Sequence, residues 1–153
     1  MSSISCPPSP AGRFADSREY TLISDEELVQ RATAVVCRRV LSKDTTAGQV
    51  GCALLTARGN VYVGVCIDTP CGIGFCAEHN AIGTMITEGE SAIATIVAVN
   101  HHGNVIPPCG RCREFIHQVD PANVRTRVLL GGERVATIAE LLPEHWAAAW
   151  LAK

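Results

Sequence analysis

The sequence lacks the features of a membrane or nucleic-acid-binding protein. No apolar run approaches the roughly 20 residues that a membrane-spanning helix needs. Charged residues make up only 18% of the 153 residues, the net charge is −2, and Lys and Arg form no cluster. Because clustered positive charge supplies most of the affinity for nucleic acids, neither a nucleic-acid partner nor a membrane is expected.

The sequence also lacks the cysteine density of a disulfide scaffold. Its eight cysteines fall below the share, about 8–10%, that is typical of such scaffolds. The N-terminal region has no apolar stretch that could act as a signal peptide. A cytoplasmic, reducing location is therefore expected, where clustered cysteines are more often metal ligands or catalytic groups than disulfides.

Apolar residues make up 47% of the chain, which indicates one globular domain. The Ser- and Pro-rich residues 1–22 are predicted to be a flexible tail, and residues 23–153 the folded domain. Ser24 with Glu27 predicts a capping box that opens a helix, and the apolar face of this helix is predicted to run from Leu28 to Val40. The hydrophobic pattern then alternates between helix and strand, which predicts a mixed sheet with helices on its faces. Strands are expected at 50–57, 61–67, 93–99 and 124–130, with further helices at 76–88, 110–119 and 138–142 and at the C-terminus.

Two short motifs, each at the start of a predicted helix, carry the chemistry. Cys76 opens one helix, while Cys109 and Cys112 lie three residues apart in the first turn of another, so both thiols can point to one side. The partial positive charge of a helix N-terminus favours thiolate and hence metal binding. Three protein ligands on Zn²⁺ leave the fourth tetrahedral position for water, as in a catalytic site.

Glu78, two residues after the first ligand, is predicted to lie beside the metal without coordinating it. There it can take a proton from water and deliver it to a substrate. Three thiolates on Zn²⁺ give a net charge of about −1, which weakens the metal as a Lewis acid. Arg111, between two ligands, is the candidate to compensate this charge.

Together, Cys76-Ala77-Glu78 and Pro108-Cys109-Gly110-Arg111-Cys112 resemble the motif of the zinc nucleobase deaminases. In having Cys as the first ligand, the chain resembles the cytidine deaminases and blasticidin-S deaminases, which act on free nucleosides. The resemblance runs from about Leu28 to Trp146. It implies a three-layer α/β/α cytidine-deaminase-like fold with a five-stranded mixed sheet, one Zn²⁺ per subunit, and a homotetramer whose active sites neighbouring subunits complete.

The resemblance is weaker at the positions where the family binds its substrate. Cytidine deaminases usually carry Asn-x-Glu-Asn before the zinc motif and a Phe before the first strand; here Cys66 and Asp68 stand in the first place and Gln49 in the second. Both departures resemble blasticidin-S deaminases, in which an aromatic corresponding to Trp146 closes the pocket. Gln49, Cys66, Asp68 and Trp146 are thus the expected substrate contacts, and cytidine is expected to be a poor substrate.

The expected activity is hydrolysis of the 4-amino group of a cytosine nucleoside or nucleoside-like compound, with release of ammonia. The alternatives are deamination of another small aminoheterocycle, or a non-catalytic zinc-stabilised binding protein, for example with Cys71 as a fourth thiolate. His79 is predicted either to line the entrance or to be an ordinary helix residue, and His101 and His102 to lie in a solvated loop. Four of the other cysteines are predicted to be small apolar fillers: Cys6, Cys37, Cys52 and Cys66.

Overall fold

A computed structural model describes residues 23–151 of the chain. The predicted N-terminal tail, 1–22, lies outside the described residues. The elements, in chain order, are α1 (Asp25–Ala34), β1 (Arg39–Val40), β2 (Thr46–Thr56), β3 (Val61–Asp68), α2 (Ala77–Thr87), β4 (Ile93–Asn100), β5 (Val105–Ile106), α3 (Gly110–Val119), the 3-10 helix η1 (Pro121–Arg125), β6 (Arg127–Gly131), β7 (Arg134–Thr137), α4 (Ile138–Leu141) and α5 (Trp146–Leu151).

The strands form one mixed sheet. The five strands of four or more residues pair in the order β3-β2-β4-β6-β7. β4 and β6 are parallel, and the other neighbours in this order are antiparallel. The two-residue strands β1 and β5 pair with β2 and β4. The predicted five-stranded mixed sheet is therefore confirmed, with two short strands added to it.

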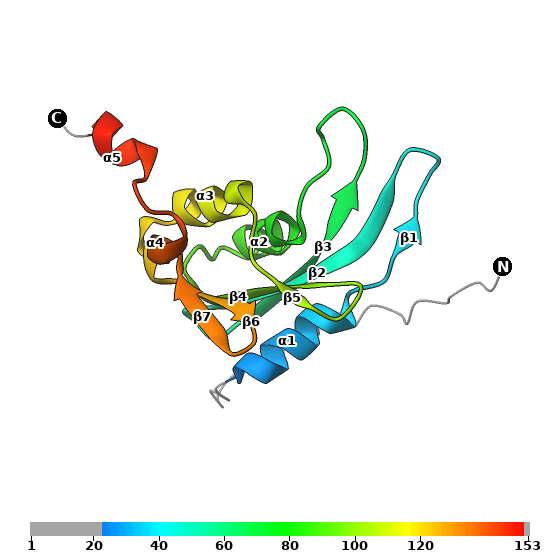
Figure 1. The fold of residues 1–153 in the computed structure, drawn as a ribbon, viewed down its shortest axis with the longest axis horizontal. Coiled ribbons are helices and arrows are strands. Elements are labelled where there is room, and N and C mark those ends of the chain that lie inside the picture. Colours follow the sequence, from blue (N-terminus) through cyan, green and yellow to red (C-terminus); the bar gives the residue numbers. More distant parts are fainter. Residues whose placement is uncertain (1–22, 152–153) are drawn as a thin grey trace.

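Helices cover both faces of this sheet and make three layers (Figure 1). On one face, Leu28 and Ala32 of α1 pack against Ala53, Val97 and other apolar residues of the sheet. On the other face, residues of α2, α3 and α4 join a second cluster with alternate residues of the same strands. The predicted three-layer α/β/α fold is confirmed.

Two glycines let helices approach the sheet closely. A Cβ on Gly51 would lie 2.2 Å from the carbonyl oxygen of Ala32 in α1. A Cβ on Gly64 would lie 2.4 Å from the backbone nitrogen of Ala81 in α2. The absence of a side chain at Gly64 therefore allows α2 to pack closely on the sheet. This matters for the site because α2 carries the first part of the motif.

The structure also corrects several local expectations. The first helix ends at Ala34, and Val40, predicted on its apolar face, is 68% exposed. The Ser24 side chain does cap α1, but Glu27 pairs with Arg31 instead of completing a capping box. Cys37, predicted to be an apolar filler, is disulfide-bonded.

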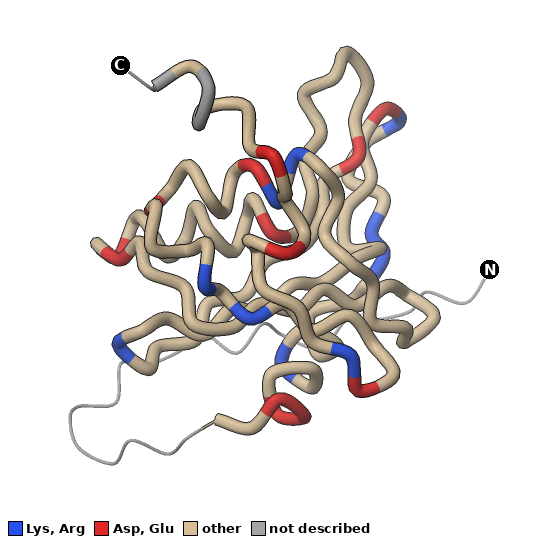
Figure 2. Tube along the Cα trace, turned by 60° about the vertical axis from the view of Figure 1, so that its left-hand side comes forward, with Lys and Arg blue, Asp and Glu red and all other residues tan. Residues whose placement is uncertain are grey.

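Charge is spread thinly over the described part of the chain. Figure 2 shows Lys and Arg dispersed among Asp and Glu along the trace. Within residues 23–151, no helix combines the length and the apolar character needed to cross a bilayer.

Candidate metal and active site

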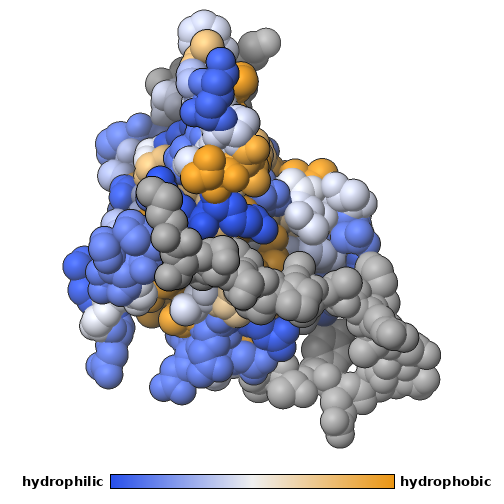
Figure 3. All heavy atoms as spheres, turned by 90° about the vertical axis from the view of Figure 1, so that its right-hand side faces the viewer, coloured by the Kyte–Doolittle hydropathy of each residue, from blue (hydrophilic) through white to orange (hydrophobic). Residues whose placement is uncertain are grey.

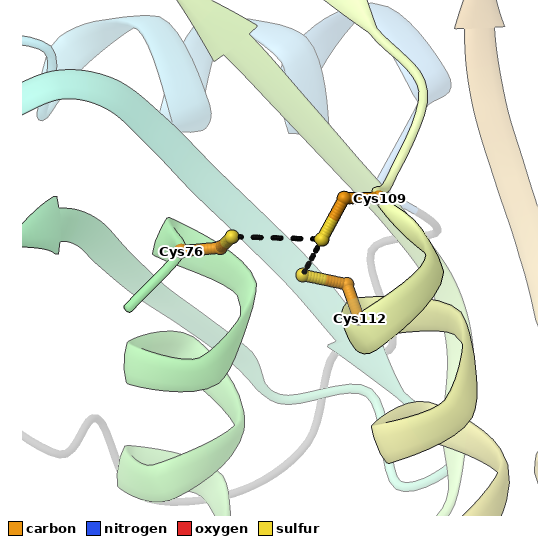
Figure 4. Close-up of side chains that lie close together, drawn as sticks. All are labelled: Cys76, Cys109 and Cys112. Atoms are coloured by element: carbon orange, nitrogen blue, oxygen red, sulfur yellow. Dashed lines mark hydrogen bonds between the residues drawn. The ribbon is translucent and has the colours of Figure 1, made fainter. Parts of the chain in front are cut away.

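The two halves of the motif meet because α2 and α3 begin side by side. Cys76 is the N-cap of α2, Cys109 is the N-cap of α3, and Cys112 lies in the first turn of α3. The Sγ atoms of Cys76 and Cys109 are 3.7 Å apart, and those of Cys109 and Cys112 are 3.5 Å apart. Figure 4 shows the three thiols pointing toward one another from the two helices.

This cluster has the dimensions of a zinc site. Zn–S bonds of about 2.3 Å in a tetrahedron place two sulfurs about 3.8 Å apart. In the part of the chain that the structure describes, these three cysteines are the one group of three or more His, Cys, Asp and Glu residues whose ligand atoms all lie within 4.8 Å of one another. Cys71 is not in the group, so the described residues offer three ligands, the number that a catalytic zinc site takes from its protein.

The thiols differ in how readily they ionise. Burial opposes ionisation of Cys109, but its hydrogen bonds with the Cys112 backbone and with the Cys112 and Cys76 thiols outweigh burial and lower the pKa of Cys109. Burial and the charge of Glu78 raise the pKa of Cys112, which is 0% exposed. Burial likewise raises the pKa of Cys76. A bound cation overrides these differences, because it deprotonates a coordinating thiol.

Glu78 follows in the first turn of α2 and is only 5% exposed. Burial raises the pKa of this carboxyl group and outweighs hydrogen bonds from its own backbone and the Cys112 thiol, which lower it. Glu78 lines the same cavity as Cys76 and Cys109. A buried carboxyl group with a raised pKa beside a metal cluster is suited to accept and return a proton.

The cavity has a volume of about 660 Å³ and reaches from the cysteines to the ends of β2, β3 and β4. Gln49, Cys66 and Asp68, the substrate contacts expected from the sequence, all line it. The Cys66 thiol accepts a hydrogen bond from the Val50 backbone at 3.3 Å and donates one to Asp68 Oδ2 at 3.5 Å. Hydrogen bonds therefore connect Cys66 with its neighbours Val50 and Asp68 on the cavity lining.

Comparisons with known proteins decide the family. Residues 22–127, which include the whole motif, match the family model of the cytidine and deoxycytidylate deaminase zinc-binding region. The chain is 33% identical to a blasticidin-S deaminase of Bacillus cereus over 78% of this chain and 89% of that protein. It is 34% identical to a cytidine deaminase of Halalkalibacterium halodurans over 65% of this chain and 78% of that one.

The crystal structure of a cytidine deaminase from Mycobacterium tuberculosis is similar to this fold with a TM-score of 0.67 and 25% identity, covering 79% of this chain and 95% of that one. The chain belongs to the cytidine and deoxycytidylate deaminase family. It is a zinc-dependent hydrolase of the deaminase type, and the three-cysteine cluster is its zinc site.

The cavity of this deaminase is also lined by residues that the motif did not indicate, among them Phe75, Asn100 and His101. Asn100 is the last residue of β4 and His101 follows it, so they reach the cavity where β4 ends and the turn into β5 begins. As expected, His101 and His102 lie in an exposed turn, and His101 also lines the cavity. A sequence pattern cannot place this turn, because its position depends on how β4 pairs with β2.

Of two further residues expected at the site, Arg111 lines the cavity and Trp146 does not. Trp146 does not line the cavity of its own chain; it is 58% exposed, and its indole N–H donates to Glu114 at 2.7 Å. Arg111 lines the cavity, and its guanidinium donates to the Gly74 carbonyl at 3.4 Å. The charge-compensating role of Arg111 remains a prediction.

The sequence left open whether His79 lines the entrance or is an ordinary helix residue, and the structure places it against a cysteine of the cluster. Its Nδ1 lies 3.5 Å from the Sγ of Cys112, and its ring stacks on Phe115 of α3 with centroids 4.7 Å apart. Burial and the nearby Arg111 lower the pKa of His79. His79 does not line the cavity of this deaminase, so it faces the zinc ligands rather than the entrance.

Proposed function

We propose that this deaminase hydrolyses the 4-amino group of a cytosine nucleoside or nucleoside-like compound, with blasticidin S, cytidine and deoxycytidine as candidate substrates. The observation that carries the proposal is the placement of Glu78 on the same cavity as the ligand cysteines Cys76 and Cys109. The products are the carbonyl compound and ammonia, so water is the only co-reactant.

Glu78 is the group that moves protons in this reaction. Cys76, Cys109 and Cys112 would hold Zn²⁺, which would lower the pKa of a water molecule to about 7 and so supply a nucleophile at neutral pH. Glu78 accepts a proton from this water and delivers it to N3 of the ring, while the water oxygen adds to C4. Glu78 then carries the second proton to the amino group, the C–N bond breaks, and ammonia leaves. The raised pKa of Glu78 suits a group that must both take up and release a proton.

The cavity wall favours a nucleoside-like compound over cytidine itself. Gln49, Cys66 and Asp68 stand where cytidine deaminases usually carry Phe, Asn and Glu, and all three line the cavity. Gln49 and Asp68 offer hydrogen-bond partners, whereas the Cys66 thiol is already engaged with Val50 and Asp68. Asn100 and His101 add further polar groups on the same cavity.

A substrate panel tests the proposal. Zinc-loaded protein is incubated with blasticidin S, cytidine, deoxycytidine and cytosine, and both ultraviolet absorbance and released ammonia are followed. The proposal expects turnover of at least one nucleoside-like compound, with kcat/KM for blasticidin S above that for cytidine. Turnover of none of the four by protein with zinc bound would overturn it and point to another amine or to a binding role.

We also propose that the active unit is a homotetramer in which Trp146 acts at a neighbouring subunit. Large apolar side chains are exposed on two projections of the single chain: Val40 and Leu41 beside β1, and Ile73 between β3 and α2. A hydrogen bond between the hydroxyls of Thr45 and Thr69 joins the two projections. Figure 3 faces this side of the molecule and shows hydrophobic atoms open on its surface. The cytoplasmic location stays a prediction.

A further inference from the structure

The zinc site carries an excess of negative charge that the protein must balance. Three thiolates on one Zn²⁺ leave a net charge of about −1. Of the three sulfurs, that of Cys112 has the least access to hydrogen bonds from solvent, because its side chain is completely shielded from water. A sulfur in this position needs a hydrogen-bond donor from the protein.

The arginines next to the ligands in sequence are engaged elsewhere. Arg111 donates to the Gly74 carbonyl. Arg113 donates to the carbonyls of Pro108 at 2.8 Å and Leu141 at 3.0 Å, which ties the start of α3 to the end of α4. Neither guanidinium has a recorded hydrogen bond to a ligand sulfur among the described residues.

His79 does reach a ligand sulfur, and two contacts fix it there. Its backbone N–H donates to the Cys76 carbonyl at 3.1 Å, in the first turn of α2. Its ring lies nearly parallel to that of Phe115, at an interplanar angle of 9°. In this orientation Nδ1 points at the Sγ of Cys112, 3.5 Å away. His79 therefore joins both helices that supply zinc ligands.

We propose that His79 is a positioning residue for the zinc site, and that its Nδ1–H donates a hydrogen bond to the Cys112 sulfur. This bond orients the sulfur and draws negative charge from it. The hydrogen bond favours the thiolate over the thiol, which supports metal affinity. A ligand that donates less charge also leaves Zn²⁺ a stronger Lewis acid, which supports the chemical step. The proposal rests on the zinc site and not on the identity of the substrate.

Three variants separate hydrogen bonding from packing. His79→Leu removes the donor, and His79→Asn keeps an N–H near the place of Nδ1. Phe115→Leu keeps the imidazole but removes the ring that holds it. His102→Leu is the matched control, because His102 lies in an exposed turn with a recorded ring contact only to His101. Zinc affinity is measured by competition with a chromophoric chelator, and the thiolate-to-metal charge-transfer band is recorded after Co²⁺ substitution.

His79→Leu should lower zinc affinity about 10- to 100-fold and shift the charge-transfer band. His79→Asn should recover most of this loss, Phe115→Leu should fall between wild type and His79→Leu, and His102→Leu should match wild type. With a working substrate, kcat should fall in His79→Leu while KM stays near its original value.

Unchanged zinc affinity and an unchanged spectrum in His79→Leu would overturn the proposal. So would an equal loss in His79→Asn and His79→Leu, because donation would then not be what matters. If His79→Leu does not fold, His79→Asn and Phe115→Leu decide by the same two readouts. Since zinc affinity needs no substrate, a silent substrate panel would leave this test intact.

Discussion

At the residue scale, the chemistry of this deaminase depends on which side chains surround one open metal position. Cys76, Cys109, Cys112 and Glu78 were predictable because helix starts are marked locally in the sequence and fix where the next few side chains point. Phe75 and His101 were not predictable, because they reach the cavity from loops whose course depends on the sheet. The contact of His79 with Cys112 could not be predicted for a similar reason, because it depends on the distance between two helices.

Replacing Glu78 with Gln should separate metal binding from catalysis. The amide keeps the size of the side chain but cannot carry the proton, so kcat should fall by about 10²- to 10⁴-fold. Zinc content, measured by elemental analysis, should stay at one ion per chain, because Glu78 is not a member of the ligand cluster. A variant that loses its zinc, or that keeps full activity, would contradict the role given to Glu78.

At the element scale, the long elements were predictable and the short ones were not. The helix expected at 110–119 matches α3, and the hairpin of β2 and β3 turns at Gly59 as its sequence indicates. By contrast, the strand expected at 124–130 begins only at Arg127, because Asn123 is buried in η1 and its side chain bonds the backbone of Ser91, Ile93 and Ile116. β7 was missed because four residues carry too little pattern.

The close contact of α2 with β3 predicts opposite effects for two glycine-to-alanine substitutions. Gly64→Ala places a Cβ against the α2 backbone, and we expect it to destabilise the fold by about 1–3 kcal/mol. Gly83→Ala, on an exposed turn of α2 with no atom near the new Cβ, should stabilise it by about 0.5–1 kcal/mol. Urea unfolding of the two variants checks the signs, and a neutral Gly64→Ala would show that α2 can move away without cost.

The attachment of α5 to α3 should depend on the ionisation of Glu114. Hydrogen bonds from Trp146, Gln118 and His145 lower the pKa of Glu114 to about 2. A lowered pKa in the folded state means that this stabilisation is complete above the ordinary carboxylate range, near pH 4.3, and is lost as the pH falls toward 2. Tryptophan fluorescence should therefore stay constant down to about pH 4 and change below it.

The matched control for this titration is Glu114→Gln, which removes the charge at all pH values. Its fluorescence at neutral pH should differ from that of wild type and should lack the acid transition. The same acid transition in the variant as in wild type would assign the change to another group.

At the scale of the whole molecule, the family resemblance predicts an assembly that one chain cannot display. The three-cysteine cluster lies within the described residues 23–151, but Trp146 lies outside the cavity of its own chain. Light scattering after size exclusion should give about four times the chain mass of 16.3 kDa. A monomer that is fully active would contradict the tetramer and the proposed role of Trp146 at a neighbouring site.

X-ray absorption at the zinc edge of the purified deaminase tests the central claim most directly. The account predicts three sulfur neighbours at about 2.3 Å and one oxygen or nitrogen neighbour at about 2.0–2.2 Å, the latter being the open position filled by water. The spectrum of Cys71→Ser should be identical, because Cys71 is not part of the ligand cluster. Four sulfur neighbours, or a spectrum that changes in Cys71→Ser, would make the site a closed structural one and contradict the account.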